Sequence, residues 1–342
     1  MPNRRRLLVV LVACAIVASV LLSSKQESFL RSHGRGRRGL EATRVVHWDL
    51  PKAADEWCLP SQHRPLRYDQ CPVNSTISEL QFIGGMTNSL KFVLLGAIMA
   101  YEENRCFVVN EQGHIVRRSD KSQALTAFTN RYFEPIGLQP DDPRVVKARK
   151  EGRIQKREWQ EVWMDLEPRR WAKKNYTIPG LGYTELNGHF LKKIMMRRLW
   201  RPLPAVREET CRSLENYGLH DDFMTFGVRR GDKTIEGFEF TPLDKYITEA
   251  EIAIDKVFGG KVPKIFVATD DCRVMAKFRE LRPEWVFVSE CDNSKGINGF
   301  VLNDMKHWTL EQTDDHYRKF FVELYAAAIA KYFIGELNCA SR

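Results

Sequence analysis

Two short charged clusters each follow a run of residues that is typical of a buried strand. The cluster RRGDK at 229–233 follows 223–228, and an aspartate pair at 270–271 follows 263–269. A planar guanidinium can bind a diphosphate through two parallel hydrogen bonds, and a carboxylate at a strand end can bind a ribose or a base edge. The clusters therefore predict a pocket for a nucleoside diphosphate, unless they form a surface network of ion pairs. The residues predicted to contact the ligand are Arg229, Arg230, Asp232, Lys233, Asp270 and Asp271.

Alternating strand and helix patterns surround both clusters. Apolar runs alternate with segments whose apolar residues recur at helical spacing. The expected strands are 223–228, 263–269, 285–289 and 332–334, and the expected helices are 242–257, 272–282 and 316–331. This alternation predicts a parallel, Rossmann-like sheet, in which the carboxyl ends of the strands share one edge. Both clusters should therefore lie close together at that edge.

A second unit of the same kind is expected earlier in the chain. A strand at 80–83 is followed by Gly84 and Gly85, a helix at 86–103 and a strand at 105–110. A glycine pair before a helix could bring backbone N–H groups close to a ligand phosphate, or it could simply form a tight turn. Residues 111–180 are polar, charged and irregular, and they could form an acceptor-facing insertion or a surface excursion with its own small apolar cluster.

These patterns predict an α/β protein with two Rossmann-like halves that face a cleft. The N-terminal half spans 71–220 and the C-terminal half spans 221–342, with the division near 215–222. The composition, 43% hydrophobic and 28% charged, is that of a globular protein and excludes a disordered or polytopic membrane chain. The net charge of +9 is concentrated in residues 1–44, which carry +7. The folded part therefore lacks the basic field that nucleic-acid binding needs.

An uncharged apolar segment lies near the start of the chain. Residues 7–24 follow the arginines at 4–6, and a helix of this length would span about 27 Å. The positive-inside rule then predicts a signal-anchor helix, with residues 1–6 in the cytoplasm and the rest in the lumen of the Golgi or the ER. This is a single-pass type II membrane protein; a cleaved signal peptide is the alternative. Residues 25–70 are expected to form a flexible stem.

Two sequons agree with a luminal position. Asn74 and Asn175 each begin a tripeptide that can accept N-linked glycans. The eight cysteines include no CxxC pair and no Cys/His spacing typical of zinc, so no metal site is expected. Spacing does not determine disulfide connectivity, and Cys58 with Cys71 is the closest plausible pair.

The segment VRRGDK at 228–233 resembles the first motif, HxRRxD, of the superfamily of GDP-fucose-dependent α1,6-, α1,2- and protein O-fucosyltransferases. Further blocks resemble the same superfamily in the same order, closest to the α1,6 type. These blocks are GGMTNSLKFVLLGAIMAYEENRCFVV at 84–109, FLKKIMMRRLWRPLPAVREE at 190–209, IFVATDD at 265–271 and FIGELNCASR at 333–342. The resemblance extends over residues 80–342.

The resemblance implies a GT-B-like fold and a glycosyltransferase that moves fucose from GDP-fucose to a glycan or glycoprotein acceptor. Transfer would invert the anomeric carbon and need no metal or other cofactor. Residues 71–220 would form the acceptor side and 221–342 the nucleotide-sugar side. Arg229 and Arg230 would hold the β-phosphate, and Arg230 would stabilise the leaving GDP in catalysis. The other residues that the resemblance assigns to the nucleotide sugar are Asp232, Lys233, Asp270, Asp271, Asn338, Ser341, Arg342, Gly84 and Gly85.

An inverting transfer also needs a base for the acceptor hydroxyl. Glu236 and Glu239 are the nearest carboxylates after the first motif, and we favour Glu236. The chain departs from the superfamily pattern in three places: Gly227 stands where the motif has histidine, Asn-Cys stands at 338–339 where serine is usual, and the sequence ends at Arg342. The degenerate third motif and the short C-terminus favour the alternative of a non-catalytic, fucosyltransferase-like binding protein of the secretory pathway, whereas the intact RRGDK and TDD segments oppose it.

Overall fold

The computed structural model places the described residues in two compact units. One unit is Ser61–Pro204, and the other is Ala205–Arg342 together with Met1–Pro60. The described residues are 46–47, 58–59, 71, 74–81, 86–110, 128–158, 174–219, 222–231, 240–293 and 302–335. Among these residues no helix is long and apolar enough to cross a bilayer. The predicted cytoplasmic tail and anchor, residues 1–24, lie outside the described part of the chain.

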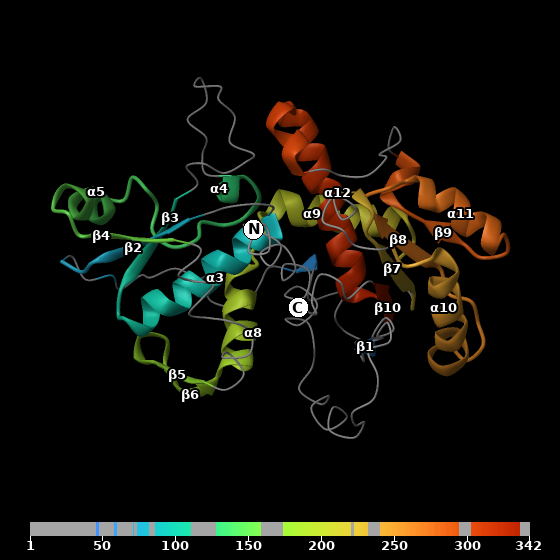
Figure 1. The fold of residues 1–342 in the computed structure, drawn as a ribbon, viewed down its shortest axis with the longest axis horizontal. Coiled ribbons are helices and arrows are strands. Elements are labelled where there is room, and N and C mark those ends of the chain that lie inside the picture. The colour runs from blue at the N-terminus through green and yellow to red at the C-terminus, as the bar shows by residue number, and fades with distance from the viewer. Residues whose placement is uncertain are drawn as a thin grey trace, which may run out of the picture. The chain divides into compact units, whose positions relative to one another are not determined.

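The unit Ser61–Pro204 (the N-terminal unit) contains a three-stranded parallel sheet (Figure 1). In this sheet β2 (Ile77–Gln81) lies between β3 (Cys106–Asn110) and β4 (Ile154–Arg157). The helix α3 (Met86–Glu102) joins β2 to β3 and packs on both strands, because its long apolar run is buried. The predicted strand–helix–strand unit is confirmed, although its first strand begins before residue 80.

Shorter elements complete the N-terminal unit. They are α4 (Phe128–Tyr132), α5 (Pro143–Lys150), β5 (Asn175–Ile178), the 3₁₀ helix η3 (Pro179–Leu181), β6 (Tyr183–Asn187) and α8 (Gly188–Leu199). The strands β5 and β6 pair antiparallel, and α8 packs against α3. The helix α5 begins after Asp142, whose carboxylate accepts a hydrogen bond from the backbone N–H of Arg144 at 2.9 Å. Part of the segment expected to be irregular therefore forms short, capped elements.

The other unit (the C-terminal unit) contains a five-stranded sheet in the order β1-β10-β7-β8-β9. The parallel strands are β7 (Met224–Val228), β8 (Ile265–Thr269), β9 (Phe287–Val288) and β10 (Tyr332–Gly335), and β1 (Val46–His47) pairs antiparallel with β10. The chain runs from β7 out to β9 and then returns to β10 on the other side of β7. The strand order therefore reverses between β7 and β10, and such a switch point is where ligands bind in open α/β sheets.

Helices cover both faces of this sheet. The helix α10 (Leu243–Val257) joins β7 to β8, and α11 (Arg273–Leu281) joins β8 to β9. After the 3₁₀ turns η5 (Glu290–Asn293) and η6 (Leu302–His307), α12 (Leu310–Ile329) leads back to β10. A capping box fixes the start of α12, because Thr309 and Gln312 exchange side-chain hydrogen bonds with each other's backbone N–H. The predicted Rossmann-like alternation is confirmed for this unit (Figure 1).

Alternate residues of β7 face opposite sides of the sheet. Met224, Phe226 and Val228 are buried in a core that α10 and α11 complete. Thr225 lies between them, and its hydroxyl donates a hydrogen bond at 3.0 Å to the carbonyl of Ala326 in α12. One face of the sheet is therefore covered by α10 and α11, and the other carries α12. This alternation decides which face each residue beyond the strand end occupies.

The helix α9 (Pro204–Asn216) belongs to the C-terminal unit. Its Cys211 forms a disulfide with Cys58, and its Glu209 lies 3.9 Å from Arg318 of α12. Just beyond the helix, the carbonyl of Tyr217 accepts a hydrogen bond from Lys264 at 2.7 Å. The division between the units therefore falls at Pro204, before the helix, and not near 215–222 as the sequence suggested.

Three disulfides link the described cysteines. They join Cys58 to Cys211, Cys71 to Cys106 and Cys272 to Cys291, with Cα–Cα distances of 5.9, 5.7 and 5.4 Å. The pair Cys58–Cys71, which is closest in sequence, is not formed. Cys71 instead precedes β2 and meets the start of β3, because these two strands are neighbours in the sheet.

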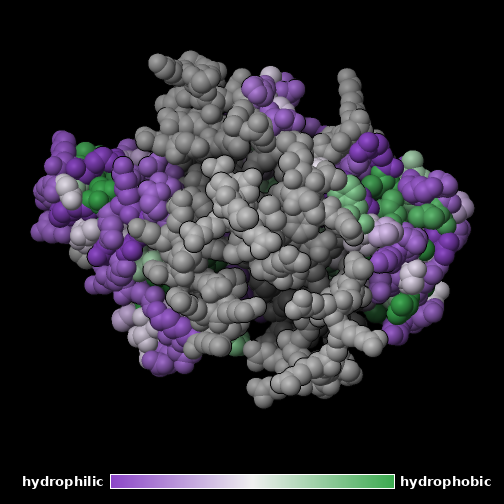
Figure 2. Space-filling view, in the orientation of Figure 1, coloured by the Kyte–Doolittle hydropathy of each residue, from purple (hydrophilic) through white to green (hydrophobic). Residues whose placement is uncertain are grey.

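Figure 2 shows one face of the molecule, on which the described surface is mostly hydrophilic. Large hydrophobic side chains that are exposed among the described residues are spread over several elements, such as Val146 of α5, Phe190 of α8 and Ile252 of α10. Single exposed side chains of this kind are normal on a protein surface and need no partner.

Candidate functional site

The two charged clusters meet at the carboxyl edge of the C-terminal sheet. Val228 of β7 pairs with Thr269 of β8, so Arg229 and Asp270 follow at the ends of neighbouring strands. The Arg229 Nε atom lies 3.2 Å from Asp270 Oδ2. The backbone N–H of Arg230 donates a hydrogen bond to Asp270 Oδ1 at 2.7 Å. The two clusters thus lie together as expected, and Asp270 contacts both arginines.

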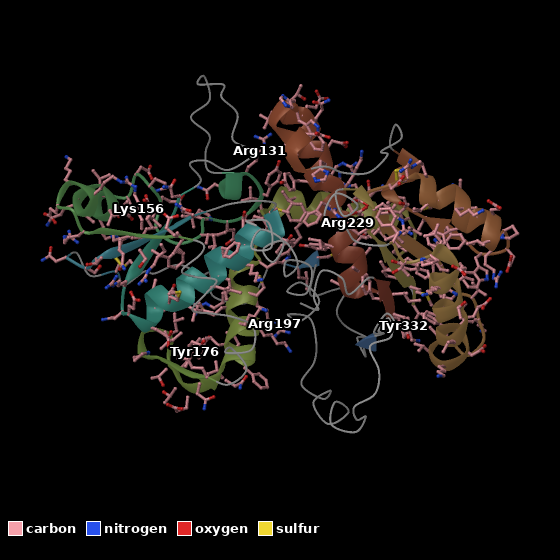
Figure 3. The ribbon with its side chains drawn as sticks, in the orientation of Figure 1. Arg131, Lys156, Tyr176, Arg197, Arg229 and Tyr332 are labelled. Carbon is pink, nitrogen blue, oxygen red and sulfur yellow. A yellow bond between two sulfur atoms is a disulfide. The ribbon has the colours of Figure 1, made fainter. Side chains whose placement is uncertain are left out.

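The two arginines lie in different surroundings. Arg230 is 8% exposed; its Nη2 donates to the carbonyl of Thr241 at 2.8 Å, and its guanidinium lies 4.6 Å from the ring centre of Phe240. The side chain of Arg229 is 34% exposed and lies near α12 (Figure 3). The two guanidinium groups therefore lie in different surroundings, and their joint binding of one diphosphate stays a prediction.

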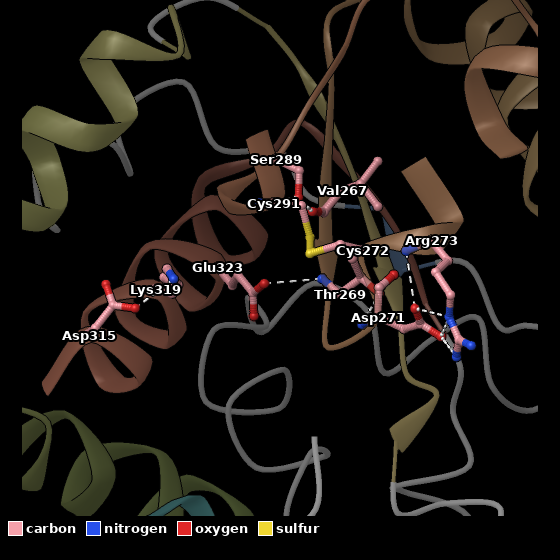
Figure 4. Close-up of a disulfide and its surroundings, with 10 residues drawn as sticks. All are labelled: Val267, Thr269, Asp271, Cys272, Arg273, Ser289, Cys291, Asp315, Lys319 and Glu323. Carbon is pink, nitrogen blue, oxygen red and sulfur yellow. Dashed lines mark hydrogen bonds and ion pairs between the residues drawn. A yellow bond between two sulfur atoms is a disulfide. The ribbon is translucent and has the colours of Figure 1, made fainter. Parts of the chain in front are cut away.

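The carboxylate of Asp271 is bound by Arg273, which lies two residues later in the chain. This buried carboxylate accepts hydrogen bonds from the backbone N–H and the Nε atom of Arg273, at 3.1 and 2.8 Å (Figure 4). These bonds, with the charges of Arg273 and Arg230, keep the pKa of the Asp271 carboxyl below its ordinary range. The backbone N–H of Asp271 donates to the hydroxyl of Thr269 at 3.1 Å. Asp271 therefore fixes the turn between β8 and α11.

The carboxyl group of Glu323, on α12, lies next to the end of β8. Glu323 Oε1 accepts a hydrogen bond from the backbone N–H of Thr269 at 3.1 Å (Figure 4). Burial, with the nearby charges of Asp270 and Glu290, raises the pKa of Glu323 to about 8 against the lowering effects of the Thr269 hydrogen bond and of Arg229. Sequence reasoning missed this residue, although a lone acidic residue in the apolar stretch of the helix at 316–331 was a visible signal.

His316 lies about two turns before Glu323 on the same helix. Burial, with the positive charges of Arg229 and Lys319, lowers the pKa of His316 to about 4 against the opposing effect of Asp315. Its ring packs edge-on against Trp308, with the ring centres 5.3 Å apart. At neutral pH, His316 is therefore uncharged and Glu323 is mostly protonated.

A disulfide links the turn that follows the aspartates to the segment that follows β9. Cys272, directly after Asp271, is joined to Cys291 in η5 (Figure 4). Ser289 supports the same region, because its hydroxyl donates to the carbonyl of Val267 at 2.7 Å and accepts from the backbone N–H of Cys291 at 3.2 Å. The ends of β8 and β9 are thus fixed to each other next to Asp270.

The remaining predicted site residues lie outside the described part of the chain. They are Gly84, Gly85, Asp232, Lys233, Glu236, Asn338, Ser341 and Arg342. Their roles stay predictions. Within the described ranges, no three His, Cys, Asp or Glu side chains come together in a way that could hold a metal ion. Metal independence likewise stays a prediction.

We expect Glu323→Gln to change the pH dependence of stability. Because the folded-state pKa is about 8 and the ordinary value is 4.5, the native state keeps a proton that the unfolded chain releases. The stabilising contribution is full below the lower value and is lost as pH rises to the higher one. Glutamine keeps the acceptor for Thr269 but does not titrate. The melting temperature of the wild type should therefore fall relative to the variant between about pH 5 and about pH 8.5.

Glu311→Gln, an exposed position in the first turn of α12, is the matched control for this experiment. Its melting temperature should follow the wild-type pH profile with at most a constant offset. Parallel profiles for the wild type and Glu323→Gln would show that Glu323 is ionised in the folded protein.

No family model matches the chain, and no curated protein sequence matches it. Among solved structures, the chain is similar to the fucosyltransferase NodZ from Bradyrhizobium, with a TM-score of 0.44 and 13% identity over 75% of this chain and 87% of that chain. It is also similar to the NodZ α-1,6-fucosyltransferase soaked with GDP-fucose (TM-score 0.41, 12% identity, 75% and 93% covered) and to the one co-crystallised with GDP (0.38, 14%, 64% and 80%). At these scores we transfer no residue role from NodZ to this chain.

Proposed function

We propose that the chain is an inverting, metal-independent glycosyltransferase that moves fucose from GDP-fucose to a glycan or glycoprotein acceptor. The observation that carries the proposal is the pair Arg229–Asp270, one residue beyond two neighbouring strands and beside the switch point between β7 and β10. This is the position at which open α/β sheets bind nucleotides. The resemblance of VRRGDK to the first fucosyltransferase motif supports the choice of donor.

In this proposal, the partly exposed Arg229 binds the diphosphate and stabilises the charge that develops on the leaving GDP. Asp270 accepts hydrogen bonds from the ribose once the diphosphate has drawn Arg229 away from it. Arg230 acts indirectly: its backbone N–H donates a hydrogen bond that positions the carboxylate of Asp270. Glu236 is proposed as the base that removes the proton from the acceptor hydroxyl.

The second candidate is a binding protein that retains GDP-fucose or GDP without catalysing transfer. The degenerate third motif favours it, because Asn-Cys stands at 338–339 where serine is usual. Release of GDP from GDP-fucose only after an acceptor is added would support the transferase. Tight binding of GDP without such release, for every acceptor in a panel of N-glycans, other glycans and Ser/Thr peptides, would support the binding protein.

We propose a luminal position, behind a signal anchor at residues 7–24, in the Golgi or the ER. Both sequon asparagines, Asn74 in the turn before β2 and Asn175 in β5, have exposed side chains and can be reached by the glycosylation machinery. We expect digestion with a peptide-N-glycosidase to increase the mobility of the chain expressed in secretory cells. Asn74→Gln and Asn175→Gln should each remove one glycan, and the double variant should be insensitive. A wild-type chain whose mobility does not change on digestion would contradict the proposed position.

A further inference from the structure

An aromatic ring lies over two glycines at the switch point. Gly335 of β10 pairs with Gly227 of β7. A Cβ atom added at Gly335 would lie 2.5 Å from the Cε1 and Cζ atoms of Phe333, and one added at Gly227 would lie 2.7 Å from Cζ. Such distances are shorter than real Cβ contacts, so both positions must be glycine for the ring to lie there. The same packing explains why position 227 has no room for the histidine of the motif.

Phe333 lies on the face of the sheet that carries Arg229. Its neighbours in β10, Tyr332 and Ile334, are buried in the core with α10 and α11. By alternation, Phe333 faces the other side. Its ring extends toward the carboxyl edge as far as Gly227, and Arg229 follows two residues later, about 7 Å further along the chain. The ring and the guanidinium therefore lie on one face at the switch-point edge.

The ring is only partly buried, although the strand residues on either side of it are buried. Glycine inside a strand reduces stability, and it often marks a place where another group comes close. Here two paired glycines make room for one aromatic ring on the sheet face, two residues before the strand end at which Arg229 and Asp270 pair. An apolar, planar surface next to a cation suits a ligand that has a planar ring at one end and an anion at the other.

We propose that Phe333 is the base-recognition residue of this site, and that its ring stacks against the heterocyclic base of the nucleotide while Arg229 holds the diphosphate. This inference rests on the proposed function and adds to it a specificity determinant. Stacking on an aromatic ring gives affinity without reading hydrogen-bond donors or acceptors. Phe333 should therefore favour a nucleoside diphosphate over a bare diphosphate, and it should do so for purine bases in general.

The test compares binding of GDP with binding of inorganic pyrophosphate, which lacks the base, by calorimetry on the full chain. Phe333→Leu keeps an apolar side chain but removes the planar ring. We expect this variant to bind GDP roughly 5- to 100-fold more weakly, while its affinity for pyrophosphate changes less than about two-fold. Gly335→Ala should act in the same direction, because its Cβ displaces the ring. Phe190→Leu, at an exposed phenylalanine of the N-terminal unit, is the matched control and should change neither affinity.

Equal losses for GDP and pyrophosphate would show that the ring only supports the sheet edge, and would overturn the inference. So would unchanged GDP binding in Phe333→Leu, which would leave the proposed function intact. If Phe333→Leu and Gly335→Ala both fail to fold, the ring belongs to the structural core and the inference is wrong. A folded wild-type chain that binds neither ligand would overturn the proposed function itself.

Discussion

Replacing Arg229 with lysine should lower turnover with GDP-fucose by roughly 10- to 1000-fold, the range for removing one charge-stabilising donor. Lysine keeps the positive charge beside Asp270 but loses the planar fork that can bind two phosphate oxygens at once. The side chain is partly exposed, so the melting temperature should change little. Arg229→Ala should reduce turnover at least as strongly.

Arg230→Lys is the matched comparison. For this variant we expect the clearer effect on the melting temperature rather than on turnover. Arg230 is buried, donates to Thr241 and packs on Phe240, so its replacement should lower the melting temperature clearly. The resemblance gives Arg230 a role in catalysis, and the burial of its side chain adds an expected loss of stability. Near-normal transfer by both Arg229 variants would remove the diphosphate assignment.

Removing the disulfide Cys272–Cys291 should lower both the stability of the protein and its affinity for GDP. The closed loop spans a sequence separation of 19, for which loop entropy corresponds to about 3 kcal/mol of stability. The double variant Cys272→Ser/Cys291→Ser should also bind GDP roughly ten-fold more weakly or worse, because the turn that follows Asp270 loses its connection to η5. Thermal unfolding and GDP calorimetry on the same preparation would measure both effects.

The disulfide Cys71–Cys106 provides the control, since it lies in the N-terminal unit. Cys71→Ser/Cys106→Ser should reduce stability without a matching loss of GDP affinity. If the two double variants lose GDP affinity equally, the loss reflects general destabilisation. If neither does, the β8–α11 turn does not position Asp270 for the ligand.

The alternation of strands and helices in the C-terminal unit could be predicted because each element has a local signal. The apolar run of β8 and the helical spacing of apolar residues in α12 are visible within a few residues of sequence. The start of α12 was harder to place, since it depends on the capping pair Thr309 and Gln312 and not on apolar spacing. The meeting of Arg229 with Asp270 followed from parallel pairing of neighbouring strands.

What the sequence could not determine depends on contacts between distant segments. The partners of Cys58 and Cys71 are set by which elements pack together, and neither partner is close in sequence. The role of Gly227 became visible only when the register placed it opposite Gly335 under the ring of Phe333. The separation of Arg229 from Arg230 could have been anticipated, because Val228 belongs to the buried row of β7 and the next two residues alternate.

The most direct measurement is transfer of isotopically labelled fucose from GDP-fucose to an acceptor, with the product isolated and its anomeric configuration determined. We predict acceptor-dependent transfer by the wild type in the presence of EDTA, inversion at the anomeric carbon, and a loss of roughly ten-fold or more in Arg229→Ala. The contradicting result is a folded wild-type chain that binds GDP but transfers no fucose to any acceptor of the panel, with or without manganese.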